Sequence, residues 1–366
     1  MNQLNQDQLT RIYIKGFKSI KECEIELSNI NVLIGSNGAG KSNFISIFEL
    51  LKKISERRLS SYAQEEGAGT LFYNGTKETD SFIVGFYFGS STYSFELKMT
   101  KQSGLNFIEE NVGSENSPWS GSDYNESELQ EWYNSNNPSI DKRIKNAIAI
   151  VLRGQWRIYH FNDIYSIIKP RNYNISNNEF LHKDAANLAA FLYRLKEHYL
   201  AEYNDILHAV QIAAPYFLDF HLKPEEGNNE HIIFKWKQKG CNDIFNASQL
   251  SDGTFRFICL STLLLQPSEL QPTTIIIDEP ELGLHPLAIA IFYEMVQKAA
   301  VNKQIILTTQ SVELLDHFNI EDIIVVDNNE NGSEFKRLTA EKLKFWLEED
   351  YSLGELWNKN IFGGRP

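Results

Sequence analysis

The chain has 366 residues, 42% of them hydrophobic and 23% charged, and a formal net charge of −13 at pH 7. This composition is typical of a globular protein with a large core and room for two or three domains, and the acidic balance argues against nucleic-acid affinity over the whole surface. Residues 1–10 are polar, no apolar run is long enough to span a bilayer, and the three cysteines lie far apart, so we expect a reduced, cytoplasmic protein with no membrane partner.

The first predicted elements are two short strands around a turn. Residues 11–14 and 25–27 have strand character, and Gly16-Phe17-Lys18-Ser19 between them favours a turn. Residues 31–34 form an apolar strand, and after residues 35–42 the apolar side chains recur at helical spacing. The order strand, glycine-rich turn, helix is the context in which a phosphate-binding loop occurs.

The turn at residues 35–42 reads G-S-N-G-A-G-K-S and matches the P-loop pattern G-x-x-x-x-G-K-[ST] in full. Its glycines allow backbone N–H groups to close around a triphosphate at a helix N-terminus, where the dipole favours anions. We expect Lys41 to reach the β- and γ-phosphates of ATP and to take part in catalysis, and Ser42 to ligate Mg²⁺. A chance glycine turn is the alternative. The predicted nucleotide-binding residues here are Ser36, Asn37, Gly38, Ala39, Gly40, Lys41, Ser42 and Asn43.

The next part of the chain predicts a β-rich insertion. Residues 82–88 and 92–97 are aromatic and alternating, with Gly89-Ser90-Ser91 between them, and they predict an antiparallel hairpin. Residues 101–138 are rich in Ser, Asn, Glu and Gly and predict a long surface excursion. Residues 156–161 return to strand character.

A helical insertion follows. In residues 184–214 the apolar side chains recur every three or four positions, which predicts one or two amphipathic helices, far too short for a long coiled-coil arm. Residues 231–236 predict another alternating strand. The visible basic clusters are interpreted as solvated helix faces. They are Lys52, Lys53, Arg57 and Arg58, and Lys142, Arg143 and Lys145.

The last third of the chain alternates strands and helices. Buried strands are predicted at residues 274–277, 304–307 and 323–326, with a helix at 287–300. This alternation indicates an α/β sheet with helices on both faces.

The strand at residues 274–277 ends in two acids, Asp278 and Glu279. On a P-loop fold this is the Walker B position, where Asp278 would orient Mg²⁺ through water and Glu279 would polarise the attacking water as general base. The alternative is a strand that merely ends in a polar turn.

Residues 250–254, L-S-D-G-T, precede an apolar helix and resemble the ABC signature L-S-G-G-Q, with substitutions at the third and fifth positions. The Ser251 hydroxyl, the Gly253 N–H group and the helix N-terminus would form a second anion site. In the ABC superfamily that site faces the γ-phosphate held by the partner subunit. An ordinary helix N-cap is the alternative.

Taken together, these motifs resemble the RecF/SMC/OLD-like branch of ABC ATPases and not transporter ATPases. Residues 16–20, G-F-K-S-I, match the motif before the P-loop, and residues 278–286, D-E-P-E-L-G-L-H-P, match the Walker B and D-loop of that branch. More narrowly, the chain resembles stand-alone predicted AAA-family ATPases that lack a Toprim domain and end in Gly-Gly-Arg-Pro, so we expect a complete protein. The segments that carry this resemblance are residues 159–163, 187–192, 250–254 and 357–366.

The resemblance implies an α/β fold, a P-loop NTPase of ABC/SMC-head type with an antiparallel β subdomain and a short helical lobe. The expected division is 9–60 and 241–366 for the two parts of the ATPase head, 151–176 for the Q-loop region, 61–150 for the β-rich lobe and 177–240 for the helical lobe.

The resemblance also assigns roles to single residues. Lys18 would contact nucleotide, Asn162 occupies the Q-loop place and would meet Mg²⁺ and the γ-phosphate, and His285 in the D-loop should face a dimer seam. Gln310 stands where most ABC proteins carry the switch histidine. Its amide can hydrogen-bond to water or phosphate but cannot usefully take up a proton, so the hydrolytic switch should differ.

The resemblance favours an ATP-hydrolysing homodimer with two composite sites, acting as a switch in DNA-related antiphage defence. Only 29 residues follow Arg337, too few for a nuclease domain, so cleavage would come from a separately encoded effector. The alternative is a RecF-like repair clamp that binds double-stranded DNA directly. A transporter ATPase is disfavoured by the SMC-type motifs.

Overall fold

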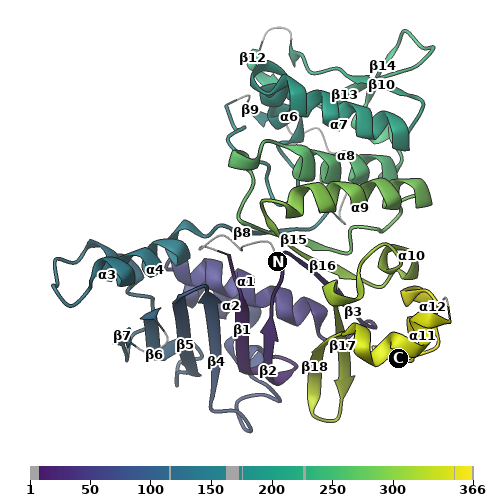
Figure 1. Ribbon diagram of the computed structural model, residues 1–366. Coiled ribbons are helices and arrows are strands. Elements are labelled where there is room, and N and C mark those ends of the chain that lie inside the picture. The colour runs from purple at the N-terminus through teal and green to yellow at the C-terminus, as the bar shows by residue number, and fades with distance from the viewer. Residues whose placement is uncertain are drawn as a thin grey trace. The chain divides into compact units, whose positions relative to one another are not determined.

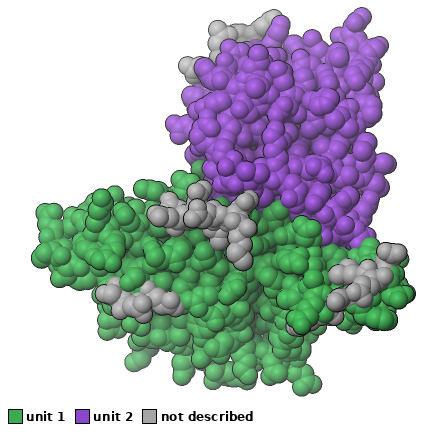
Figure 2. Space-filling view, in the orientation of Figure 1, with its two compact units in different colours: residues 1–157, 319–366 green, residues 158–318 purple. Residues whose placement is uncertain are grey.

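The computed structural model describes residues 8–114, 117–161, 173–174, 176–225, 228–349 and 351–364. The chain forms two compact units, residues 1–157 with 319–366 and residues 158–318, which are described one at a time (Figure 2). In the described part of the chain, no helix combines the length and the apolarity that crossing a bilayer requires.

The first unit contains a six-stranded antiparallel sheet with the order β2-β1-β4-β5-β6-β7 (Figure 1). The hairpin expected between residues 82 and 97 is confirmed: Phe86 pairs with Tyr93, and both side chains are buried. The strands of this sheet are β1 (Arg11–Phe17), β2 (Ile20–Glu26), β4 (Ser81–Phe88), β5 (Ser91–Met99), β6 (Leu105–Ser114) and β7 (Ser117–Gly121).

The expected surface excursion at residues 101–138 is wrong, because this segment supplies β6, β7 and a helix, α3 (Leu129–Asn134). The polar Glu110 belongs to the interior: its side chain is fully buried and accepts hydrogen bonds from the hydroxyls of Tyr93 (2.7 Å), Ser127 (2.6 Å) and Tyr124 (2.8 Å). Hydrogen bonds from distant residues therefore allow a polar segment to enter the core.

The same unit contains β3, which pairs in parallel with β17, and β17 pairs in antiparallel fashion with β18. All five side chains of β3 are buried, as expected for a strand covered on both faces. The bounds are β3 (Ile30–Ile34), β17 (Ile323–Asn329) and β18 (Gly332–Arg337). The helices of this unit, besides α3, are α1 (Lys41–Ser55), α2 (Leu59–Glu66), α4 (Lys142–Arg153), α11 (Ala340–Glu348) and α12 (Leu353–Asn358), with 3-10 turns η1 (Ala68–Leu71) and η4 (Ile320–Asp322).

The second unit contains the parallel pair β15 and β16, in which Asp278 lies opposite Thr308. The predicted helical stretch at 184–214 is two helices, and the predicted strand at 231–236 is split between β12 and β13. Its helices are α6 (Leu188–His198), α7 (Leu200–Ala213), α8 (Asp252–Leu265), α9 (Pro286–Ala300) and α10 (Val312–Leu315), with 3-10 turns η2 (Ala247–Gln249) and η3 (Ser268–Leu270). Its strands are β9 (Tyr173–Asn174), β10 (Phe217–Phe220), β11 (Pro224–Glu225), β12 (Asn228–Ile232), β13 (Lys235–Gln238), β14 (Ile244–Asn246), β15 (Thr274–Asp278) and β16 (Gln304–Thr309), and β8 (Trp156–Tyr159) leads into it.

Candidate nucleotide site

The P-loop of the first unit joins β3 to α1 as the sequence predicts. The residue before the helix, Gly40, has φ 118° and provides no side-chain cap. The first N–H groups of a helix have no acceptor within the helix, so the uncapped N-terminus of α1 offers donors to an anion.

Lys41 is the first residue of α1, and only 6% of it is exposed. Its ammonium group donates hydrogen bonds to the backbone carbonyls of Gly35 (2.6 Å) and Ser36 (3.0 Å). These hydrogen bonds keep the ammonium group of Lys41 at the loop where we expect the phosphates to bind. Ser42, the next residue, is exposed.

Two glycines of the loop are required by close approach of β17 and β18. A Cβ at Gly35 would lie 2.2 Å from the carbonyl oxygen of Val326, and a Cβ at Gly40 would lie 2.1 Å from Oγ of Ser333. No larger side chain fits either place without moving the neighbouring strand.

The end of the described chain also holds the P-loop, a role that the sequence analysis did not identify. The N–H group of Ser36 donates to the carbonyl of Gly364 (2.7 Å), and Gly364 has φ 84°. The side-chain amide of Asn328 donates to the carbonyl of Gly38 (3.3 Å). Only the Gly-Gly pair at residues 363–364 signalled this role, and the sequence analysis used it as a family mark.

Two other predicted nucleotide ligands have protein partners. The amide of Asn43 donates to Oγ of Ser19 (2.7 Å), and the ammonium of Lys18 lies 3.3 Å from a carboxylate oxygen of Glu66. Lys18 has φ 47° in the turn between β1 and β2. Their contact with nucleotide stays a prediction.

In the second unit, β15 ends at Asp278, whose two carboxylate oxygens have different partners. Oδ1 accepts a hydrogen bond from the hydroxyl of Thr308 on β16, and Oδ2 lies 3.4 Å from Nδ1 of His160. His160 belongs to the family segment at residues 159–163, but no spacing in the sequence placed it beside Asp278.

Glu279 follows with an unusual backbone conformation. Its φ is 47°, in the left-handed region that side chains other than glycine rarely adopt, and its N–H group donates to the carbonyl of Thr308 (3.1 Å). The side-chain amide of Gln310 donates to Oε1 of Glu279. Backbone strain of this kind persists where surrounding contacts fix it, and it clusters at functional sites.

Glu281 is a further acid that the sequence analysis did not select. Its Oε1 accepts hydrogen bonds from the hydroxyl of Thr309 (2.6 Å) and the N–H group of Gln310 (3.2 Å). Its Oε2 is buried and has no hydrogen-bond partner in the described part of the chain, and burial raises the pKa of this carboxyl group. Glu281 thus fixes the backbone of Gln310, whose side chain contacts Glu279.

In the signature segment, Ser251 is the N-cap of α8. Oγ of Ser251 accepts a hydrogen bond from the N–H group of Thr254 (3.2 Å). A Cβ at Gly253 would lie 2.1 Å from the carbonyl oxygen of Gly283, so the signature packs directly on the D-loop. Ser251, Gly253 and His285 line one small hollow of about 90 Å³, and His285 is exposed. The cap and the predicted anion site use the same helix end.

Arg256 connects the signature helix to the segment after β8. It is 6% exposed, its Nε donates to the carbonyl of Phe161 (3.0 Å), and burial lowers the pKa of its guanidinium group. Phe161 immediately precedes Asn162, and the predicted role of Asn162 falls outside the described residues.

The expected Mg²⁺ donors fit that ion chemically. Ser42 presents an exposed hydroxyl at the N-terminus of α1, and Asp278 presents carboxylate oxygens at the end of β15. Neither belongs to a group of three or more His, Cys, Asp or Glu side chains that could hold a metal ion, because the described residues contain no such group. A P-loop site does not need one, since phosphates and water complete the coordination.

Solved structures share this fold. The head of an Smc protein bound to the C-winged-helix domain of ScpA matches with a TM-score of 0.62 at 16% identity, over 91% of this chain and 99% of the other. An Smc head with an extended coiled coil, bound to the C-terminal domain of ScpA from Pyrococcus furiosus, matches with a TM-score of 0.61 at 14% identity, over 93% and 99%. The predicted SMC-head type of P-loop fold is confirmed.

No curated protein sequence matches the chain. A family model described as "AAA domain, putative AbiEii toxin, Type IV TA system" matches residues 30–316, a span that contains the P-loop, the signature and the Walker B acids. The chain belongs to this AAA-domain family, and its fold is that of an SMC-type ATPase head.

Proposed function

We propose that the chain binds ATP with Mg²⁺ and hydrolyses it to ADP and phosphate. The observation that carries the proposal is the uncapped N-terminus of α1 with Lys41 buried at its first position, because it combines backbone donors and a fixed cation at one point. Mg²⁺, when bound, neutralises charge on the phosphates. Ser42 and Asp278 would hold it.

The hydrolytic roles divide among the chain's own residues. Lys41 stabilises negative charge on the β- and γ-phosphates, and Glu279 accepts a proton from the attacking water. Gln310 holds Glu279 in place through its amide and cannot itself compete for that proton. The proposal requires the P-loop and Glu279 to act on the same nucleotide.

We further propose that two copies close around two nucleotides. Ser251 and Gly253 lie at the N-terminal end of α8, in a hollow whose described lining residues include no lysine. In a closed homodimer this helix end would contact the γ-phosphate bound by the partner. Leu282 and Leu287 support this proposal, since both are more than 40% exposed beside the D-loop histidine. Apolar side chains next to a functional loop favour a protein contact.

The proposed setting is antiphage defence with a separately encoded effector, a nuclease being the favoured class. Two observations support it: the family description names a toxin of a type IV toxin–antitoxin system, and the related Smc heads are bound to domains of another protein, ScpA. A RecF-like clamp on double-stranded DNA is the second candidate. The cations of α4, on an otherwise acidic chain, favour it.

Co-purification from the native operon tests this proposal, with the unmodified chain and with Glu279→Gln. We expect one neighbouring gene product to be retained, in greater amount with the variant and ATP. Retention of no partner, together with tight duplex binding by the ATPase alone, would favour the clamp.

A further inference from the structure

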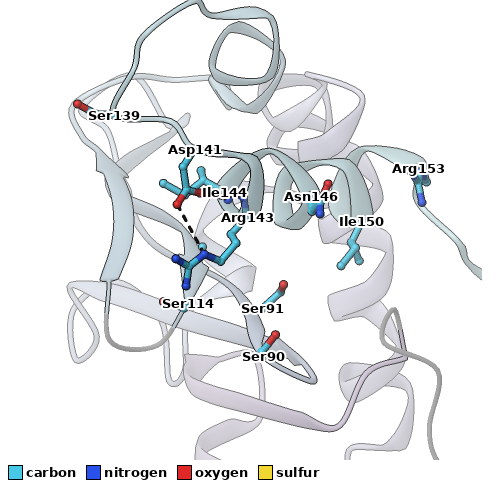
Figure 3. A pocket seen from close by; sticks show the side chains of 11 residues that line it. Ser90, Ser91, Ser114, Ser139, Asp141, Arg143, Ile144, Asn146, Ile150 and Arg153 are labelled. Atoms are coloured by element: carbon cyan, nitrogen blue, oxygen red, sulfur yellow. Dashed lines mark hydrogen bonds and ion pairs between the residues drawn. The ribbon is translucent and has the colours of Figure 1, made fainter.

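A polar groove runs along α4 in the first unit, the helix whose cations favour the second candidate function, and its lining includes none of the predicted ATP-site residues. It encloses about 740 Å³ and is lined mainly by hydroxyl, amide and charged side chains. Figure 3 shows Arg143 and Arg153 toward opposite ends of α4, with Ser90 in the turn before β5 and Ser91 at the start of β5.

The sequence of α4 explains why one face of it is cationic. The helix contains Lys142, Arg143, Lys145 and Arg153 and no acidic residue, in a chain whose net charge is −13. Ala147, Ile148 and Val151 are buried, and α4 packs on β5 and β6. Arg143, Asn146, Ile150 and Arg153 recur at intervals of three or four, share one stripe of the helix, and line the groove.

The sequence of residues 142–145 favours a solvated helix face. Arg143 is indeed solvent-exposed, but it also lines a concave site, whereas the ammonium of Lys145 donates to the carbonyl of Ser135 (2.9 Å). Two members of the cluster therefore have defined positions, Arg143 in the groove and Lys145 on a backbone carbonyl, which a plain solvated face would not require.

We propose that this groove binds the phosphate backbone of a nucleic-acid strand. Arg153 lies ten positions after Arg143, a distance of about 15 Å along the helix axis at 1.5 Å per residue, or roughly four base steps of 3.4 Å. Guanidinium, hydroxyl and amide groups are the side chains that contact phosphate and sugar in nucleic-acid complexes. The groove supplies all three, since Ser91 and Asn146 line it together with the two arginines.

The lining argues against other ligands. A small organic ligand prefers a mostly apolar cavity, and Ile144 and Ile150 are the large apolar side chains among the residues that line this groove. Asp141 is the one acid among those lining residues: its Oδ1 caps α4 by accepting from the N–H groups of Arg143 and Ile144, and its Oδ2 lies 3.7 Å from Nε of Arg143. That carboxylate weakens the attraction for an anion, so its removal should strengthen binding.

The groove lies within residues 90–153, which include neither the P-loop, the signature nor the Walker B acids. Binding is therefore measured without nucleotide, and its outcome is separate from that of the proposed ATPase. The full chain is titrated against fluorescent 20-nucleotide single strands and 20-base-pair duplexes of mixed sequence, by anisotropy at about 50 and 200 mM salt.

We expect the double variant Arg143→Gln/Arg153→Gln to weaken binding about tenfold or more. The slope of log affinity against log salt concentration should fall in magnitude by roughly 1.4 for single strands or 1.8 for duplexes, because each of two lost phosphate contacts contributes about 0.7 or 0.9. Asp141→Asn should tighten binding severalfold, because it removes the negative charge beside Arg143. The helix cap is kept, since Asn caps a helix as well as Asp does. The control Lys98→Gln/Lys101→Gln removes the same charge near the other end of β5 and should change binding less than twofold.

All variants should melt at the same temperature as the unmodified chain, since the altered side chains are exposed. Opposite effects of the arginine and aspartate variants support the groove. Four results would each overturn the proposal. They are no oligonucleotide binding at about 50 mM salt, an equal loss of affinity in the lysine control, weaker binding by Asp141→Asn, and tighter binding of a poly-glutamate peptide than of either oligonucleotide.

Discussion

The side-chain amide of Gln310 donates a hydrogen bond to Oε1 of Glu279. Glu281 restrains the backbone of the same residue, since its Oε1 accepts from the N–H group of Gln310 at 3.2 Å. A neutral amide restrains the proposed general base but cannot exchange protons with it. This arrangement suits a slow switch better than a fast motor.

We expect Gln310→His to raise ATP turnover about tenfold, which corresponds to about 1.4 kcal/mol in the activation barrier. A histidine ring can take up and release a proton near neutral pH, whereas the amide cannot. Steady-state phosphate release measures the change, with Gln310→Ala as the variant that removes the side-chain hydrogen bond altogether. Identical turnover in all three proteins would exclude position 310 from the switch.

Lys41→Ala should abolish hydrolysis, chiefly through loss of nucleotide binding. Removing a preorganised group that stabilises negative charge commonly costs about 2.7–4 kcal/mol, or 10²–10³-fold. Titration with a fluorescent ATP analogue gives the affinity. Lys52→Ala is the matched control, because Lys52 lies on the same helix with its side chain 57% exposed. If both variants bind nucleotide equally well, Lys41 is not a phosphate ligand.

Arg256→Met should reduce the turnover rate constant while leaving the affinity of the P-loop for nucleotide unchanged, because Arg256 acts through Phe161 and the signature helix. It should also cost about 1–3 kcal/mol of stability, since the buried carbonyl of Phe161 loses its donor. Urea unfolding and single-turnover kinetics separate the two effects. Arg256→Lys keeps the charge and should recover part of the turnover; a loss of stability with normal turnover would reduce Arg256 to a structural role.

Glu110 should make stability depend on pH in the direction opposite to most carboxylates. Burial raises the pKa of Glu110 in the folded chain, so between its unfolded and folded pKa values the folded state binds more protons. Its contribution to the free energy of unfolding therefore increases as pH falls, by about 1.4 kcal/mol per unit of pKa shift. Unfolding measured from about pH 8 to about pH 5 should show the difference between the unmodified chain and Glu110→Gln growing toward acid pH; a constant difference contradicts this.

The sequence predicted the P-loop and the buried parallel strands, because local residue patterns identify both. The P-loop could be predicted because Gly40, with its left-handed backbone, and Lys41, which begins α1, meet local requirements. The close packing of Gly35 against Val326 is a contact between distant residues, and only the motif signalled it. The strands β15 and β3 could be predicted because each is an unbroken run of mostly aliphatic residues, as is typical of a strand buried on both faces.

What the sequence could not predict depends on contacts between distant residues. The polar strand around Glu110 has no apolar period that identifies it, because hydroxyls up to 17 residues away satisfy its carboxylate. The contact of Gly364 with Ser36 and the restraint of Gln310 by Glu281 join residues remote in sequence, and neither leaves a spacing to detect.

Light scattering of the Glu279→Gln variant shows whether the chain forms a nucleotide-driven homodimer. The variant should bind ATP with Mg²⁺ but not hydrolyse it, since the amide cannot accept the proton while the loop that binds phosphate is unchanged. We expect the mass of two chains, about twice 42.1 kDa, with ATP and Mg²⁺, and the mass of one chain without nucleotide. The mass of a single chain at micromolar concentration, in saturating ATP and Mg²⁺, would exclude such a dimer.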